Sequence, residues 1–438
     1  MTGWFDLKLN VSKKYIIGNT PAGSEPLIVN EILEETKQPS IYIASNREKQ
    51  ERFLEASNFL CPNLKSEALP AWDCLPYDRL FPSPKIIGQR VKTLTNLANQ
   101  LSRIDVLVVT AASVMQLVPP INYFQDKFLE LNVGQKIERD FFIRQLVDYG
   151  YRNSPLVYEP GDFAIRGGII DLFPSSEIDP VRIDFFGDSI EAIRYFDVRS
   201  QISSKSLGKV KIMSLMEFDF TNDSVSKFRS NYRRHFGGVK VNNQTYHSVS
   251  ERHYMQGVEH FLPFFHEKLV PIFEYLEGAL IFCDSGAKSH IKEHEKLIKK
   301  QFEIRQLDFG LGSEGKEKSN LVPIESMFLN FDALNSSLSE TSVVTFDENP
   351  SPKGQFFLNS EIKYGRDFTL ERTNKNSSVI EPLVAYINQV RSKKPIFLIF
   401  YSQKAAERFK LLLEEFGVTG IMFCECINIF ESITSKIF

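Results

Sequence analysis

The first part of the chain alternates short apolar segments with amphipathic helical segments. YIIG (15–18), SIYIAS (40–45) and IDVLVVTAASVMQLV (104–118) contain the apolar runs expected of buried strands, and the last continues into a turn and a helix. The segments PLIVNEILEE (26–35) and REKQERFLEASNFL (47–60) have helical spacing. This β-α-β order predicts a parallel sheet covered by helices.

A glycine-rich loop lies between the first strand and the first helix. Gly18 and Gly23 have the G-x-x-x-x-G spacing of a phosphate-binding loop, in which Lys and then Ser or Thr should follow. Here Ser24 and Glu25 follow, so a carboxylate replaces a positive charge. Like charges ~4 Å apart repel by roughly 4 kcal/mol at an effective dielectric of ~20. The loop is a chance match, a degenerate ATP site or a functional one, and its place between strand and helix favours the degenerate site over chance.

Composition limits the class of protein. With 438 residues the chain is long enough for two to four domains, and its net charge of −3 gives no overall basic field for nucleic acid. Five cysteines in a chain of this length form no disulfide framework and indicate a reducing compartment. The N-terminus has no apolar signal core, and no apolar run approaches 18 residues. We therefore expect a cytoplasmic protein without a membrane segment.

The pattern changes after about residue 122. DFFIRQLVDYGY predicts a helix ended by Gly150, and GDFAIRGGIIDLFP and PVRIDFFGDSIEAIRYFD alternate like strands. FGDS (186–189) predicts a hairpin turn between two of these strands. The stretch to about residue 213 is therefore expected to be a small α+β unit.

Alternation assigns side chains of the hairpin to two faces. One face carries the apolar residues Val181, Ile183 and Phe185, and the other carries Arg182, Asp184 and Phe186. A Phe on the same face as an Arg is typical of a protein-binding hot spot, although it is also compatible with packing beneath another element. In DFAIRGG, Phe163 and Ile165 share a face and Arg166 lies opposite. We expect the polar face to be exposed.

The segments after about residue 213 include predicted strands, helices and polar loops. GALIFCDS (278–285) and SVVTFDENP (342–350) predict buried strands, and the polar stretches LGSEGKEKS (311–319) and RTNKNSS (372–378) predict a loop and a linker. At the end KPIFLIFYS, QKAAERFKLLLEEFGV and TGIMFCE predict one further β-α-β unit.

No motif predicts catalysis or a metal site. HIKEH matches the inverted zinc-peptidase signature through His290, Glu293 and His294, but it lies in a highly charged segment, for which a solvated helix face is the simpler interpretation. Cys424 and Cys426 have no second Cys pair to complete a tetrahedral site. Asp347-Glu348 follows an apolar strand as in a Walker B segment, but without an upstream lysine it predicts a strand entering a turn. We expect no cofactor.

Two long segments carry a family resemblance. LPAWDCLPYDRLFPSPKIIGQRVKTL (69–94) and YEPGDFAIRGGIIDLFPSSEIDPVRIDFFGDSIEAIRYFDVRSQIS (158–203) resemble bacterial transcription-repair coupling factors, as do YGRDFTLER, NYRRHFG and GVEHFLPFFHEKL. The resemblance implies an α/β fold: a degenerate UvrB-like, helicase-like parallel-sheet domain interrupted by a small α+β domain and followed by a small partial α/β domain. It implies that residues 1–122 and 214–371 are the two parts of the UvrB-like module and that residues 123–213 are the α+β domain. Residues 372–438 would be a linker and the small partial α/β domain.

The resemblance also implies a function. The family's second domain binds the repair protein UvrA, and its contact residues correspond to Arg166, Arg182 and Phe186. The degenerate phosphate loop would be Gly18, Gly23, Ser24 and Glu25, without ATPase activity. Full-length members contact RNA polymerase and double-stranded DNA through parts absent here, so we expect a fragment or a truncated gene. The alternative is a UvrB-like ATP-dependent DNA-binding repair protein.

One departure from the family lies beside the second domain's sheet. Family members have an Arg in the segment that reads Gln201-Ile202-Ser203 here, so the family's Arg is missing.

Overall fold

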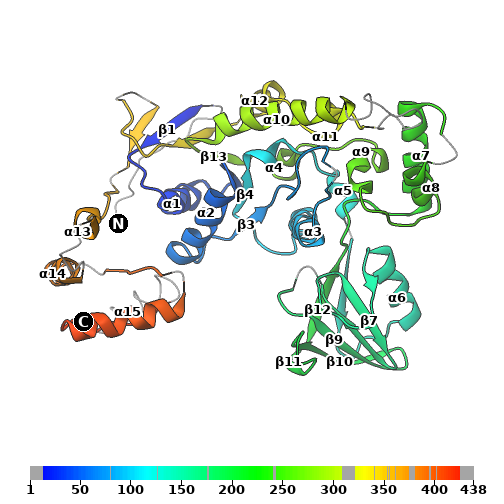
Figure 1. Ribbon diagram of the computed structural model, residues 1–438, viewed down its shortest axis with the longest axis horizontal. Helices are drawn as coiled ribbons and strands as arrows, with labels where there is room; N and C mark the ends of the chain where they lie inside the picture. The colour runs from blue at the N-terminus through cyan, green and yellow to red at the C-terminus, as the bar shows by residue number, and fades with distance from the viewer. Residues whose placement is uncertain are drawn as a thin grey trace.

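The computed structural model describes residues 13–424 with gaps at 79, 126, 175–176, 240–242, 308–320, 340, 353, 355, 361, 374–379, 394–395 and 401. The loop expected at 311–319, most of the linker expected at 372–378, and Cys426 lie outside the described residues. Two β-sheet bodies and a separate pair of helices near residues 380–415 make up the fold (Figure 1).

The larger body is built on a seven-stranded sheet in which every described strand pair is parallel. Its order is β15-β1-β14-β13-β2-β4-β3. The strands are β1 (Lys14–Gly18), β2 (Ser40–Ala44), β3 (Ser66–Leu69), β4 (Val106–Thr110), β13 (Leu280–Asp284), β14 (Val343–Phe346) and β15 (Phe357–Asn359). The central strands β13 and β14 come from the second half of the chain, so neither half forms the sheet alone. The predicted parallel sheet is confirmed.

Helices cover both faces of this sheet, because its central strands are apolar on both sides. In β2 and β4 every residue is buried. Side chains of α1 (Glu25–Thr36) and α2 (Arg47–Leu60) form one core with Tyr42 and Val108. Side chains of α3 (Pro84–Asn99), α4 (Ala111–Met115) and α10 (Ala287–Leu307) form the other core with Ile41 and Val109.

Eight further described helices complete the larger body. They are α5 (Ile121–Phe124), α7 (Asn222–Phe236), α8 (Gln244–Ser250), η1 (Val258–Phe261), α9 (Leu262–Phe265), η2 (Ile272–Tyr275), α11 (Ile324–Met327) and α12 (Phe331–Ser339). The aromatic-rich segment 258–276 is thus three short helices, because Pro263 and Pro271 each start a new one. Among the described residues, no helix combines the length and apolar character needed to cross a membrane.

The smaller body interrupts the larger one and is built on a six-stranded sheet of order β11-β10-β9-β8-β7-β6. Its strands are β6 (Arg152–Asn153), β7 (Asp162–Arg166), β8 (Ile169–Leu172), β9 (Val181–Phe186), β10 (Ser189–Phe196) and β11 (Ser203–Leu207). Helix α6 (Arg139–Asp148) packs on one face through Phe142 and Leu146. The predicted α+β unit inserted into the α/β body is confirmed.

Two strands connect the smaller body to the larger one. β5 (Phe128–Asn132) enters it, β12 (Lys209–Met213) leaves it, and the two pair antiparallel from Phe128↔Met213 to Asn132↔Lys209. At the exit, Glu217 pairs with Arg90 of α3, and both side chains are buried. The insertion therefore begins and ends at one place on the larger body, below α3 and α5 in Figure 1.

The last part of the described chain contains helices without a sheet. α14 (Ile380–Val390) and α15 (Gln403–Glu415) share a small core of Val384, Ile387, Leu413 and Val418, and α13 (Thr369–Thr373) precedes them. The helix expected at 403–418 is present, but the flanking segments expected as strands form no ladder in the described residues 396–400 and 416–424. Two strands around one helix are too few to form a stable sheet.

Candidate functional site

The six-stranded sheet has one apolar and one charged face, as alternation predicts. Val181, Ile183 and Phe185 of β9 are buried in the core beneath α6. Arg182, Asp184 and Phe186 lie on the opposite face, together with side chains from the neighbouring strands. This charged face is the candidate partner-binding surface.

Asp171 of β8 is the centre of the charged face. Its carboxylate is buried and accepts two hydrogen bonds from Arg182, from Nε at 2.7 Å and from Nη2 at 2.9 Å. Strand register explains the pair, since Asp171 lies directly opposite Arg182 in the β8–β9 ladder. Such a bidentate pair is among the strongest ion-pair geometries in proteins. The hydrogen bonds to Asp171 raise the pKa of Arg182 further above its ordinary value.

Arg182 is therefore less exposed than alternation alone suggests. Its side chain is 15% exposed, its guanidinium lies 4.9 Å from the centre of the Phe196 ring, and Nη1 donates to the Gln201 carbonyl at 3.2 Å. The expectation of an exposed Arg182 was wrong, because residues of β10 and the following loop cover this part of the sheet. Asp171 and Phe196, which hold Arg182, were missed, although an Asp within the apolar run IIDLF is a signal for such a pair.

Arg166 of β7 lies on the other side of Asp171. Its Nη1 is 4.0 Å from Asp171 Oδ2, and its side chain is 40% exposed. Farther along the face, Arg194 Nη2 lies 2.5 Å from Asp184 Oδ2. Arg166 thus shares a carboxylate that already has a bidentate partner, and it keeps donors on the accessible surface for a carboxylate of another protein.

Phe186 lies at the end of β9, beside the hairpin turn. It is 76% exposed, which agrees with the predicted exposed aromatic. Gly187 follows it with φ of +59°, a conformation that favours glycine in a hairpin turn. A Cβ on Gly168 of the adjacent turn would lie 2.8 Å from the Phe185 carbonyl oxygen. Glycine at that position allows the two turns to approach closely.

Ile202 extends the exposed apolar surface near this face. Its side chain is exposed, and it directly follows Gln201, whose carbonyl accepts a hydrogen bond from Arg182. This apolar side chain lies where the sequence resemblance leads us to expect an Arg.

The glycine loop at residues 18–25 is filled by its own side chain. Oε2 of Glu25 accepts a hydrogen bond from the backbone N–H of Gly23 at 2.7 Å, and Ser24 Oγ donates to the Pro21 carbonyl at 2.6 Å. Burial raises the pKa of the Glu25 carboxyl, in spite of backbone hydrogen bonds from Gly23 and from Glu25 itself and of nearby Lys49. A carboxylate oxygen thus uses a backbone donor that would bind phosphate in a functional loop.

Little space remains beside this loop. The adjoining cavity measures about 10 Å³, room for about one water molecule, whereas small-molecule sites typically span 300–1,000 Å³. Gly18 is packed against the turn after β14, because a Cβ there would lie 2.3 Å from the Ser351 nitrogen. In that turn, Asp347 Oδ1 accepts from the Asn349 backbone N–H at 2.8 Å. Asp347 therefore starts a turn, as predicted.

The histidine and cysteine motifs are not assembled into a site. On α10, His290 Nδ1 lies 3.0 Å from the Gly286 carbonyl, and burial lowers the pKa of half-buried His294. His294 is thus not on the fully solvated face expected for HIKEH. In the described part of the chain, no three His, Cys, Asp or Glu side chains gather as a metal site would require. The absence of bound zinc stays a prediction, which metal analysis of purified protein tests.

Comparison with known proteins first defines the class of domain. Residues 129–218 match the family model of the UvrB interaction domain, a range that begins in β5 and ends just past β12. It therefore includes the whole six-stranded sheet with its charged face.

The similarity extends beyond that domain to particular proteins. The chain is 27% identical over 346 residues to the transcription-repair-coupling factor of Haemophilus influenzae, covering 78% of this chain and 29% of the relative. It is 29% identical over 337 residues to that of Escherichia coli, covering 76% and 28% respectively. It is 33% identical over 227 residues to that of Myxococcus xanthus, covering 49% and 19%.

These matches confirm the resemblance found in the sequence. They run through both the larger and the smaller body, since a 346-residue match is longer than either. The chain spans less than a third of the length of these relatives.

Proposed function

We propose that this chain recruits the repair protein UvrA in transcription-coupled nucleotide-excision repair, and that it has no catalytic activity of its own. In this proposal the UvrB-like body consists of residues 1–122 and 214–371, and the UvrA-binding domain consists of residues 123–213. Residues 372–438 form a linker and a small further unit. The protein acts in the cytoplasm. In a longer protein of this family, other parts bind RNA polymerase and make contacts of their own with double-stranded DNA.

The observation that carries the proposal is the match of residues 129–218 to the UvrB interaction domain, together with the charged face of its sheet. Phe186 supplies exposed apolar area, and Arg166 lies on the same face. Aromatic and Arg side chains of this kind typically dominate protein interfaces. Arg182 contributes in part by holding Asp171 and the adjacent loop in place, so that Arg166 and Phe186 are presented on a rigid sheet.

The second candidate function, a UvrB-like ATP-dependent DNA-binding protein, has less support. The carboxylate of Glu25 takes the backbone donor of Gly23, and the adjacent space is small. No observation at this loop favours nucleotide binding.

The test is direct binding of the chain to immobilised UvrA. We expect Phe186→Ala to weaken binding about thirtyfold or more, the equivalent of ~2 kcal/mol. Ile178→Ala is the matched control, since Ile178 is also an exposed apolar residue of the smaller body but lies in the β8–β9 loop. Wild-type affinity in Phe186→Ala would place the UvrA site elsewhere, and absence of UvrA binding by the wild-type chain would overturn the proposed function.

A further inference from the structure

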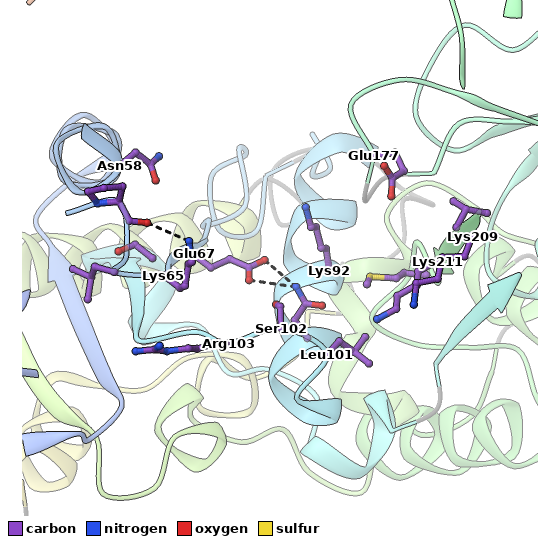
Figure 2. A pocket seen from close by; sticks show the side chains of 16 residues that line it. Asn58, Lys65, Glu67, Lys92, Leu101, Ser102, Arg103, Glu177, Lys209 and Lys211 are labelled. Carbon is purple, nitrogen blue, oxygen red and sulfur yellow. Dashed lines mark hydrogen bonds between the residues drawn. The ribbon is translucent and has the colours of Figure 1, made fainter. Parts of the chain in front are cut away.

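A second surface feature lies between the two bodies and is separate from the charged face. It is a cleft of about 690 Å³. Its residues come from the end of α2 through β3, from α3 and the loop after it, and from β12 and the β8–β9 loop of the smaller body. Figure 2 shows Lys92 on α3 to one side of this space and Lys209 and Lys211 on β12 to the other.

The cleft is positively charged, although the whole chain is negative. Five basic side chains line it: Lys65, Lys92, Arg103, Lys209 and Lys211. Two acidic side chains also line it, and both have partners. Glu67 accepts from the Asn96 amide at 3.3 Å, and Glu177 accepts from the Tyr195 hydroxyl at 2.6 Å. The lining therefore has five basic against two acidic side chains, in a chain whose net charge is −3. Glu130 and Asp105 lie beside it and pair with Lys209, Lys211 and Arg103.

Two of the basic side chains have ion-pair partners but are well exposed. Lys209 Nζ lies 3.4 Å from Glu130 and its side chain is 62% exposed, while Arg103 pairs with Asp105 at 2.7 Å and is also exposed. Solvent-exposed ion pairs of this kind contribute little to stability. A phosphate oxygen can replace such a carboxylate partner at small cost.

The distribution of the charges indicates a polymer as the ligand. The five cations do not converge on one point but lie along both walls, which suits successive phosphates of a backbone. The described residues of the lining include no aromatic ring, whereas grooves for single-stranded nucleic acid combine cations with aromatic rings for base stacking. These residues also offer no stacking surface for the base of a free nucleotide.

We propose that this basic cleft binds the phosphodiester backbone of duplex DNA without sequence preference. The choice of DNA as the polyanion rests on the proposed function in DNA repair. The two bodies contribute opposite walls, so contact with DNA bridges them. Because the charged face of the six-stranded sheet is a different surface, UvrA and DNA are bound at separate sites.

The test is fluorescence anisotropy of the full chain with a labelled 20-base-pair duplex of random sequence, titrated at several salt concentrations. We expect Lys92→Glu/Lys209→Glu, with one change on each wall, to weaken binding at least tenfold. The slope of log K against log salt should fall by about 0.9 for each phosphate that the variant no longer neutralises. Lys14→Glu is the matched control, since exposed Lys14 lies on β1, far from β3 in the sheet order.

Thermal melting checks the fold of the double variant, and Lys92→Gln/Lys209→Gln replaces it if it does not fold. Unchanged DNA affinity in a folded double variant would overturn the proposal. So would preferred binding of a labelled poly-glutamate peptide, or tighter binding of a single strand than of the duplex. UvrA binding by the same variant separates the two proposals, because we expect it to stay at the wild-type level. Loss of DNA binding in Phe186→Ala would contradict separate sites.

Discussion

Arg90 and Glu217 form a buried ion pair that ties the exit of the inserted domain to helix α3. Arg90 Nη1 also donates to the Pro70 carbonyl at 2.8 Å, and the Glu217 carbonyl accepts from His266 at 2.8 Å. The pair and these hydrogen bonds thus join four segments of the chain, at Pro70, Arg90, Glu217 and His266. Removing one member leaves the other charge buried without its partner.

We expect Arg90→Ala to lower the free energy of unfolding by about 3–5 kcal/mol, the usual effect of leaving a buried charge unpaired. The double variant Arg90→Met/Glu217→Leu should recover most of this loss, because no buried charge remains. Urea unfolding of the three proteins measures both effects. An Arg90→Ala variant as stable as the wild type would show that the pair does not stabilise the fold.

Arg182 and Phe186 should differ in their effect on stability. Phe186→Ala should change the free energy of unfolding by no more than about 0.5 kcal/mol, because the ring is exposed. Arg182→Ala should lower it by about 2–3 kcal/mol, because buried Asp171 loses two charge-assisted hydrogen bonds. Chemical denaturation of both variants decides this, and equal stabilities would mean that the Asp171 pair contributes little.

Glu25 gives the folded protein a pH dependence of known sign. Its pKa is raised by burial, so between pH 4.5 and the raised value the folded state binds more protons than the unfolded state. The contribution of Glu25 to stability therefore falls as pH rises through the raised value. We therefore expect the stability of Glu25→Gln, relative to that of the wild type, to be higher at pH 8 than at pH 4.5. Denaturant midpoints of both proteins at the two pH values measure this. A stability difference between Glu25→Gln and the wild type that is the same at both pH values would contradict the raised pKa.

His266 should have the opposite effect and make the protein sensitive to acid. Burial lowers its pKa to about 4, against about 6.5 for an unfolded chain. The contribution of His266 to the free energy of unfolding is fully present above pH 6.5 and is lost as the pH falls towards 4. The loss is up to ~1.4 kcal/mol per pH unit, or about 3 kcal/mol in total. His266→Gln should therefore flatten the stability profile over this window. A variant with the wild-type slope would assign the acid sensitivity to other groups.

Nucleotide binding provides a further check on the glycine loop. We expect no heat in titration calorimetry of the chain with Mg-ATP, because Glu25 uses the Gly23 donor and no lysine follows the second glycine. Micromolar binding that is lost in Gly23→Pro would show that the loop is a functional site.

The sequence predicts those parts of this fold in which a local pattern decides the structure. REKQERFLEASNFL coincides with α2, and the fully apolar runs in β2 and β4 indicate strands buried on both faces. Alternation also assigned the two faces of β9 correctly. It could not tell that Arg182 is covered, because its cover comes from Asp171 and Phe196 on neighbouring strands.

Features that depend on distant segments were not predictable in the same way. The basic cleft joins β3, α3 and β12, which are adjacent only after the domain has been inserted. Helix α14 was not predicted, and the strands expected on both sides of α15 have no ladder in the described residues, because a β-propensity pattern does not supply a neighbouring strand.

The antiparallel pairing of β5 and β12 has a consequence for how this architecture can arise. At the base of the pair the Ser214 backbone N–H donates to the Lys127 carbonyl at 3.3 Å, so the two ends of the insertion lie side by side. The inserted sheet has its own hydrophobic core with α6. A domain whose ends are adjacent and whose core is its own can be added, removed or exchanged by a single genetic event. A short turn from 127 to 214 would close the remaining body without repacking its parallel sheet.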